Sequence, residues 1–315
     1  MSNKLPATKP LVTKPLVAKS LVTKLPIITA DERLNTPRYI TGCIFGKYGI
    51  GKTSLLWTLD PDSTLFIDLE AGDLAVDGWQ GNTIRPDSWP QCRDLACYIG
   101  HWNNAINNDR PYSKAHCDAV YHKYGTPEGF NGKYQTIFID SITALSRICL
   151  DWCKGQPQCI SEKTGKPDMR AVYGLMGQEM ISWLTHLQHS RCFNIWFVGV
   201  LEEKQDDLGR TIFVPQIDGA KIANELPAIV DQVITLAHIK DNDGNSCRAF
   251  INHTVNSYGS PVSGYPAKDR SGQLEMIEPP HLGKLMEKIK ARAKTMQDKS
   301  QISANTKNIT TNNDK

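Results

Sequence analysis

One stretch of the sequence has the residue types and the spacing of a phosphate-binding loop. Gly46, Gly51, Lys52 and Thr53 fit the pattern G-x-x-x-x-G-K-[ST], between a short apolar run and a helical pattern. Glycines let backbone N–H groups turn toward a phosphate, and the start of a helix adds partial positive charge. The lysine is expected to reach the β- and γ-phosphates of ATP, and the threonine hydroxyl to bind Mg²⁺. The predicted nucleotide-binding residues are Gly46, Lys47, Tyr48, Gly49, Ile50, Gly51, Lys52, Thr53 and Ser54.

Acidic residues stand at the ends of three further apolar runs. Asp140 ends the run TIFID, and Asp68 and Glu70 end LFIDLE. Ligands of parallel α/β sheets bind beyond the carboxyl ends of the strands. We therefore predict that Asp140 holds Mg²⁺ and that Glu70 orients and deprotonates the attacking water. Capping of the next helix or loop is the alternative for each of these acids, Asp68 included. Glu202 and Glu203 end the third run, and one of them is a candidate sensor of the γ-phosphate.

The elements that must position these residues alternate along the chain. Apolar strands are expected at 63–70, 134–141, 193–203, 231–240 and 246–255, and helices at 54–60, 87–106, 142–155 and 172–189. Buried strands alternating with helices indicate a parallel sheet covered on both faces. The turn DNDG joins the last two strands and predicts an antiparallel hairpin at the edge of the sheet. The sequence thus predicts a mostly parallel α/β fold.

The two ends of the chain differ from its middle. The net charge is +3, yet residues 1–27 carry five Lys and no acid, in a repeat of TKPLV type whose period suits neither helix nor strand. The C-terminal stretch is polar and basic as well. We predict a disordered basic repeat arm at 1–37, a folded domain at 38–288 with an insertion at about 107–133, and a disordered tail at 289–315. Two roles fit the tails, namely solubility and contact with nucleic-acid phosphates.

Composition also restricts the compartment. The longest apolar run, IWFVGVL, is as long as a strand and too short for a membrane span. Lysines interrupt the apolar residues near the N-terminus, so no signal peptide is expected. The nine cysteines include no C-x-x-C pair, which favours reduced thiols and a cytoplasmic protein without a membrane partner.

The order of these motifs resembles a known ATPase core. LFIDLEAG after the phosphate-binding loop, followed by IFIDSITAL, resembles the RecA type. Together with ELPAIVDQVITL and KDRSG, the sequence is most similar to phage-encoded, AAA-type RecA-like ATPases of single-strand annealing recombination, over about residues 38–288. The resemblance implies that Glu70 is the catalytic glutamate. It also implies that Lys268 and Arg270 reach the γ-phosphate of a neighbouring subunit. The ending Leu-Glu-Glu departs from RecA, which has an amide there, and leaves the sensor undecided.

The same resemblance implies the partners. The implied cofactors are ATP and Mg²⁺, and the implied assembly is a homo-oligomeric ring or filament. Single-stranded DNA is the expected partner, and a single-strand-binding protein is a further candidate. If the chain is phage-encoded, the expected compartment is the bacterial host cytosol. A loop is expected at 202–227, with Lys204, Arg210 and Lys221 for phosphates and Phe213 for stacking on a base. Two functions stay open. One is a DNA-stimulated ATPase that acts on single strands, and the other is a nucleotide-switched loader or scaffold for a protein partner, with slow turnover.

Overall fold

The computed structural model describes residues 27–240, 244–254 and 264–291. Contacts divide the chain into two units, Met1–Pro37 and Arg38–Lys315. The first unit contains the helix α1 (Ala30–Asn35), which begins with a capping box. The Thr29 Oγ1 atom accepts a hydrogen bond from the Glu32 N–H at 3.2 Å. The prediction of a disordered arm is therefore wrong for these six residues, and the lysine-rich repeat lies outside the described residues.

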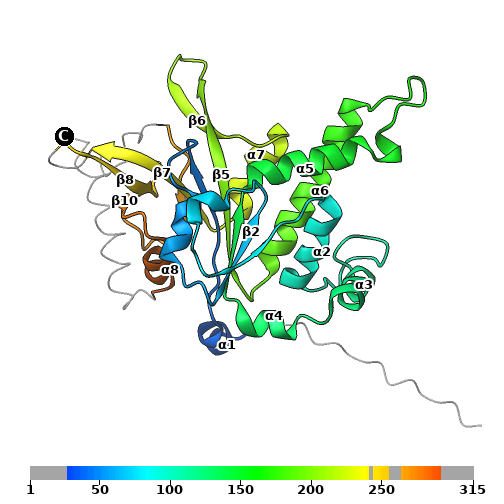
Figure 1. Cartoon of the computed structure of the whole chain (residues 1–315), viewed down its shortest axis with the longest axis horizontal. Helices are drawn as coiled ribbons and strands as arrows, with labels where there is room; N and C mark the ends of the chain where they lie inside the picture. Colours follow the sequence, from blue (N-terminus) through cyan, green and yellow to red (C-terminus); the bar gives the residue numbers. More distant parts are fainter. Residues whose placement is uncertain (1–26, 241–243, 255–263, 292–315) are drawn as a thin grey trace, which may run out of the picture. The chain divides into compact units, whose positions relative to one another are not determined.

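The described residues of the second unit form a ten-stranded sheet. Figure 1 shows this sheet with helices around it. Its strands are β1 (Thr41–Gly46), β2 (Thr64–Asp68), β3 (Asn82–Ile84), β4 (Thr136–Asp140), β5 (Asn194–Gln205), β6 (Thr211–Pro215), β7 (Gln232–Lys240), β8 (Ser246–Ile251), β9 (Lys268–Asp269) and β10 (Ile277–Glu278). The order is β10-β8-β7-β1-β5-β4-β2-β3, with β6 beside β5 and β9 beside β7. The strands from β3 to β7 in this order pair in parallel, and β8, β10, β6 and β9 pair antiparallel. The predicted mostly parallel sheet is confirmed.

Helices cover both faces of this sheet. They are α2 (Trp89–Gly100), α3 (Lys114–Tyr124), α4 (Glu128–Lys133), α5 (Ile142–Lys154), α6 (Met169–His189), α7 (Ala220–Ile229) and α8 (Leu282–Lys290), with the 3₁₀ helices η1 (Thr53–Thr58), η2 (Asp73–Val76) and η3 (Pro157–Cys159). Strand alternation divides the core: Cys43 and Phe45 pack with α2, α5 and α6, whereas Ile44 packs with η1 and α8. This two-sided burial is why the central strands are apolar at nearly every position.

The segment at 107–133 is folded into the domain. It contains α3 and α4. The Ser113 hydroxyl caps α3 by accepting a hydrogen bond from the His116 N–H at 3.3 Å. Cys117 and Val120 are buried in the same core cluster as α2 and α6. The segment therefore contributes side chains to the core on that face of the sheet.

The prediction of a loop at 202–227 is wrong. β5 continues to Gln205 and pairs antiparallel with β6, and α7 follows. The hairpin projects from the sheet in Figure 1. Its turn has Asp206 at the first position, where the carboxylate accepts hydrogen bonds from the N–H groups of Leu208 and Arg210, and Gly209 at φ +72°. The last residues of β5, from Glu203 to Gln205, resemble a loop in the sequence because they are polar and exposed.

The other expected elements lie close to their predicted ranges. The hairpin of β7 and β8 is confirmed, and the two-residue strand β10 lies outside it at the sheet edge. The helix expected after the phosphate-binding loop is the 3₁₀ helix η1, in which the Leu59 N–H donates to the carbonyl of Leu56. No helix in the described ranges is long and apolar enough to cross a membrane.

Candidate functional site

The phosphate-binding loop follows β1 at the carboxyl edge of the parallel strands. Gly49 and Gly51 have φ values of +72° and +87°, which side chains with a Cβ adopt rarely. A Cβ atom built on Gly46 would lie 2.8 Å from the carbonyl oxygen of Leu236, so the close approach of β7 requires glycine there. A Cβ built on Gly49 would meet nothing within 4 Å. The loop therefore has the backbone and the open face that a phosphate cradle needs.

Lys52 reaches across this loop. Its Nζ atom donates hydrogen bonds to the carbonyl oxygens of Gly46 at 3.1 Å and Lys47 at 3.0 Å. Burial lowers the pKa of Lys52, and the negative charges of Asp140 and Glu70 oppose this shift. The ammonium group is thus held inside the loop, and its donors can also satisfy phosphate oxygens.

Thr53 and Asp140 meet next to Lys52. The Thr53 hydroxyl donates to Asp140 Oδ2 at 2.5 Å. The pKa of Asp140 is raised to about 6, mainly by burial. The hydrogen bond from Thr53 opposes this rise, and the negative charge of Glu70 adds to it. A hydroxyl and a carboxylate are oxygen ligands of the kind that Mg²⁺ prefers. The donor set therefore fits the predicted metal.

Glu70 follows β2, the neighbour of β4 in the sheet. Its Oε1 atom accepts a hydrogen bond from the Ser141 hydroxyl, and Ser141 itself caps α5. The pKa values of Lys52 and Asp140 respond to the charge of Glu70, which places its carboxylate near both. Glu70 is exposed, so water can reach it. The predicted base thus lies beside the predicted phosphate and metal residues.

Asp68 lies two residues before Glu70 and has a structural role. Its side chain is buried. One carboxylate oxygen accepts hydrogen bonds from the N–H groups of Glu70 and Gly72, and the other accepts from Arg85 Nε at 3.0 Å. The capping alternative that the sequence left open therefore applies to Asp68.

Of the two candidate sensors, Glu203 contacts the loop. Its Oε2 atom lies 3.0 Å from Lys47 Nζ. The same ammonium lies 5.0 Å from the ring centroid of Phe213 on β6, and Phe213 stacks on Tyr265 at 4.4 Å. Glu202 points to Lys204 instead. One lysine of the loop is thus connected to the β5–β6 hairpin.

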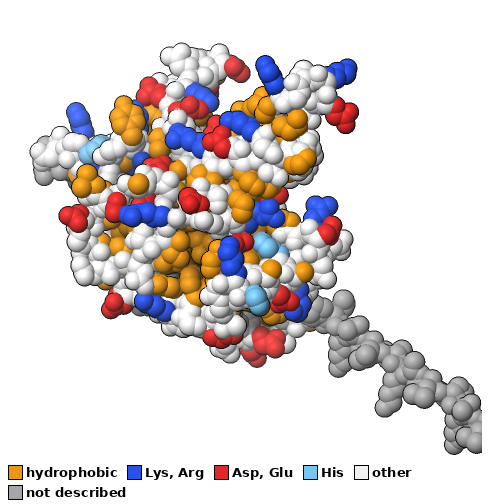
Figure 2. All heavy atoms as spheres, turned by 45° about the vertical axis from the view of Figure 1, so that its right-hand side comes forward, with side chains coloured by type: hydrophobic (Ala, Val, Ile, Leu, Met, Phe, Trp, Pro, Cys, Tyr) orange, Lys and Arg blue, Asp and Glu red, His pale blue; other side chains and the backbone are white. Residues whose placement is uncertain are grey.

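The predicted DNA-contacting cations are spread over this hairpin and α7. Arg210 pairs with Asp206 at 2.7 Å, and Lys221 lies 3.8 Å from Glu225. Lys204 is paired with Glu202. On the face shown in Figure 2, Lys and Arg side chains are interspersed with Asp and Glu. Each of the three predicted cations thus has a carboxylate partner, so these residues do not form a separate basic surface.

Lys268 and Arg270 lie far from the loop of their own subunit. β9 pairs with the first residues of β7, beside the amino-terminal end of β1. Lys268 Nζ donates to the carbonyl oxygens of Pro227 and Val230, both at 2.7 Å, at the end of α7. Arg270 Nη1 lies 2.8 Å from Asp231 Oδ1. Within one subunit, neither side chain is brought to the candidate site.

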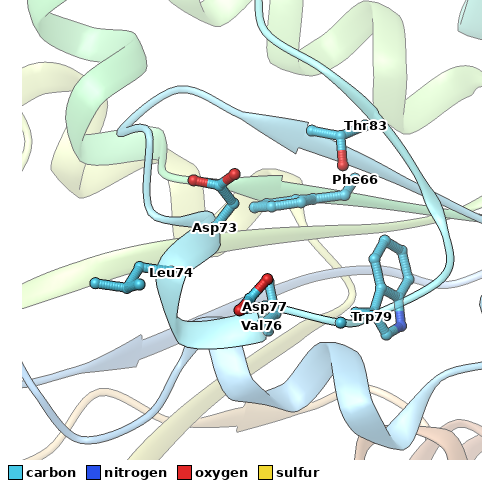
Figure 3. Close-up of a pocket in the computed structure, with 8 residues that line it drawn as sticks. Phe66, Asp73, Leu74, Val76, Asp77, Trp79 and Thr83 are labelled. Carbon is cyan, nitrogen blue, oxygen red and sulfur yellow. The ribbon is translucent and has the colours of Figure 1, made fainter.

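Two further features were not expected from the sequence. Arg248 on β8 donates from Nη1 to the carbonyl oxygen of Ile50 at 3.2 Å, so it contacts the phosphate-binding loop. It belongs to no recognisable motif, and only the pairing of β8 with β7 brings it there. A pocket of ≈450 Å³ lies beside η2 (Figure 3) and contains none of the predicted site residues. It is lined by Phe66, Asp73, Leu74, Val76, Asp77, Gly78, Trp79 and Thr83.

Comparison with known families decides the class of this site. The AAA domain profile matches residues 38–271, most of the chain. The chain belongs to the AAA domain family. This AAA domain protein is accordingly a P-loop ATPase, as its loop geometry indicates. No curated relative matches it.

Solved structures provide distant likenesses. One is the RadB recombinase, at 10% identity and a TM-score of 0.31, with 69% of this chain and 81% of that chain covered. Another is an ATPase of the type III secretion system of pathogenic bacteria, at 15% identity and a TM-score of 0.33, with 63% and 51% covered. At these TM-scores, neither likeness bears on the function.

Proposed function

We propose that this AAA domain protein is a RecA-like ATPase that hydrolyses ATP with Mg²⁺ and acts on single-stranded DNA. The observation that supports hydrolysis is the meeting of Lys52, Thr53, Asp140 and Glu70 at one edge of the sheet. These groups come from the carboxyl ends of β1, β4 and β2, and β5 lies between β1 and β4 in the sheet. They are the cation, the metal ligands and the base that phosphoryl transfer to water requires.

Each residue has a distinct role in this proposal. Thr53 and Asp140 would hold Mg²⁺, which would neutralise phosphate charge when bound. Lys52 binds the β- and γ-phosphates. Glu70 orients the attacking water and accepts its proton, and Ser141 positions the Glu70 carboxylate by its hydrogen bond. Because Ser141 is fixed as the cap of α5, this orientation is set before any substrate binds.

We further propose that Glu203 is the sensor. The Lys47–Glu203 ion pair is half-exposed, and solvent screens pairs of this kind, so the pair adds little to stability. A phosphate can therefore compete for Lys47 at small cost. Release of Glu203 would free the β5–β6 hairpin, which also carries Phe213. The hairpin is the element that we propose meets single-stranded DNA.

The loader or scaffold remains the second candidate. It is favoured by the pairing of Lys204, Arg210 and Lys221 with carboxylates, which reduces the positive charge that a DNA backbone would meet. Assembly into a ring or filament, with Arg270 completing the site of a neighbouring subunit, belongs to the first candidate. It follows from the resemblance of the KDRSG element.

ATP turnover with and without single-stranded DNA tests this proposal. We expect DNA to stimulate the parent protein and Lys52→Ala to show no turnover. Glu203→Gln should retain the basal rate and lose the stimulation. Glu202→Gln is the matched control, because it breaks only the pair with Lys204 and should respond to DNA as the parent does. A parent rate that is indifferent to DNA would favour the loader or scaffold.

A further inference from the structure

The β7–β8 hairpin places an arginine directly against the phosphate-binding loop. Besides donating to Ile50, the Arg248 guanidinium fills the space above Gly51. A Cβ atom built on Gly51 would lie 2.1 Å from Arg248 Nη1 and 3.7 Å from Ser54 Oγ. The arginine therefore covers the stretch of the loop between Ile50 and Ser54.

The position of Arg248 follows from the packing of the hairpin. Leu236 and Phe250 are paired across β7 and β8 and are buried in the core cluster that contains η1. His238 and Arg248 form the pair two residues nearer the turn, so they lie on the same face of the sheet. Because β7 continues past the end of β1, this pair lies beyond the end of β1 and beside the loop that follows it. Buried neighbours thus hold the arginine at this site.

The Arg248 guanidinium has no carboxylate partner in the part of the chain that the structure describes. Lys47 pairs with Glu203, and Arg85 pairs with Asp68, but no ion pair among the described residues includes Arg248. The hydrogen bond that it donates to Ile50 goes to a neutral carbonyl oxygen. A guanidinium has five N–H donors in a planar fork that matches phosphate oxygens. An anionic ligand of the loop would therefore satisfy Arg248 better than its present partner.

The strand order indicates which part of a nucleotide lies nearby. β7 and β8 lie on one side of β1, and β5, β4 and β2 lie on the other. Asp140 and Glu70 come from β4 and β2, so the hydrolysed γ-phosphate belongs on that side. A nucleotide that crosses the loop then directs its α-phosphate and ribose toward β7 and β8, where Arg248 is placed.

We propose that Arg248 is a nucleotide-binding residue that acts within its own subunit, on the α-phosphate and ribose end of the nucleotide. The inference rests on the phosphate-binding loop of the proposed function and is independent of DNA. Since ATP and ADP share this end, Arg248 contributes to the affinity for both. It contributes nothing to the hydrolytic step, which belongs to Lys52, Asp140 and Glu70.

Equilibrium titration of the full chain with ADP and with the non-hydrolysable analogue AMP-PNP, in Mg²⁺ and without DNA, tests this assignment. Loss of one hydrogen bond from a charged group should raise both Kd values about tenfold in Arg248→Ala. Arg248→Lys keeps the charge without the planar fork and should lie between. Arg191→Ala removes an exposed arginine just before β5 and is the matched control, with parent values expected. At saturating ATP, kcat of Arg248→Ala should stay within about twofold of the parent.

Several results would overturn the assignment. One is that Arg248→Ala binds both ligands with the Kd values of the parent. Another is that it loses affinity for AMP-PNP alone, which would place Arg248 at the γ-phosphate. A third is that its kcat falls while both Kd values are unchanged. The melting temperature without nucleotide shows whether each variant is folded. If Arg248→Ala is not, Arg248→Lys decides, and parent affinity in that variant would refute the proposal. The same titrations of Lys52→Ala show whether the phosphate-binding loop binds nucleotide as proposed, so that a failure of the proposed function is distinguished from a failure of the Arg248 assignment. Stimulation by DNA is measured in a separate assay.

Discussion

Lys268 and Arg270 lie in one short element, yet the structure predicts different consequences of removing them. Lys268→Met keeps an apolar stem and deletes the donors to the carbonyl oxygens of Pro227 and Val230 at the end of α7. Burial lowers the pKa of Lys268, so desolvation offsets part of the gain from these bonds. A hydrogen bond to a charged group contributes about 1.5–3 kcal/mol. With the desolvation offset, we expect Lys268→Met to lower the free energy of unfolding by about 2 kcal/mol. For a domain of this size that corresponds to a fall in Tm of about 4–8 °C.

Thermal unfolding followed by circular dichroism, without nucleotide, measures this difference. Arg270→Met is the control, because Arg270 forms a solvent-exposed ion pair with Asp231. The Arg270 side chain is 52% exposed and the Asp231 side chain 32%. Such a pair contributes at most about 1 kcal/mol, so Tm should fall by less than about 4 °C. A parent Tm for Lys268→Met, or a larger fall for Arg270→Met, would refute the assignment of Lys268 to the end of α7.

Two further predictions concern the site itself. Arg270→Ala and Lys52→Ala should each be inactive alone, and ATP turnover should partly return on mixing if Arg270 completes a neighbouring site; full activity of Arg270→Ala alone would exclude that role. The pKa of Asp140 is raised from 3.8 to about 6, so its contribution to stability is present below pH 3.8 and is lost as pH rises through 6. Asp140→Asn should consequently have a higher Tm than the parent at pH 8 without Mg²⁺, and this gain should disappear near pH 4; a lower Tm at pH 8 would contradict it.

Local patterns predicted which side chains lie together where the residues are adjacent in the sequence or end an apolar strand. The loop from Gly46 to Ser54 is contiguous, and Asp140 ends a buried strand, so a parallel sheet alone brings them to one edge. The sequence also predicted that Glu70 lies at this edge, although it could not separate its role from that of Asp68. That separation depends on Arg85, which takes the Asp68 carboxylate.

Contacts between distant strands could not be predicted in the same way. Glu203, and not Glu202, meets Lys47 because of which side of β5 each residue occupies. The β5–β6 hairpin was mistaken for a loop because the last residues of β5, from Glu203 to Gln205, are polar and exposed. Arg248 reaches the loop through the pairing of β8 with β7, and a lone arginine in a strand has no motif to mark it.

The central claim is that the site hydrolyses ATP with Glu70 as the base. Single-turnover hydrolysis of radiolabelled ATP by Glu70→Gln, beside the measured affinity for ATP, tests it most directly. The amide keeps the shape and can still accept the Ser141 hydrogen bond, but it cannot take a proton from water. We predict affinity close to that of the parent and a hydrolysis rate at least about 100-fold lower, the lower limit for loss of a general base. Hydrolysis at the parent rate, with ATP bound normally, would contradict the account and move the catalytic role to another residue.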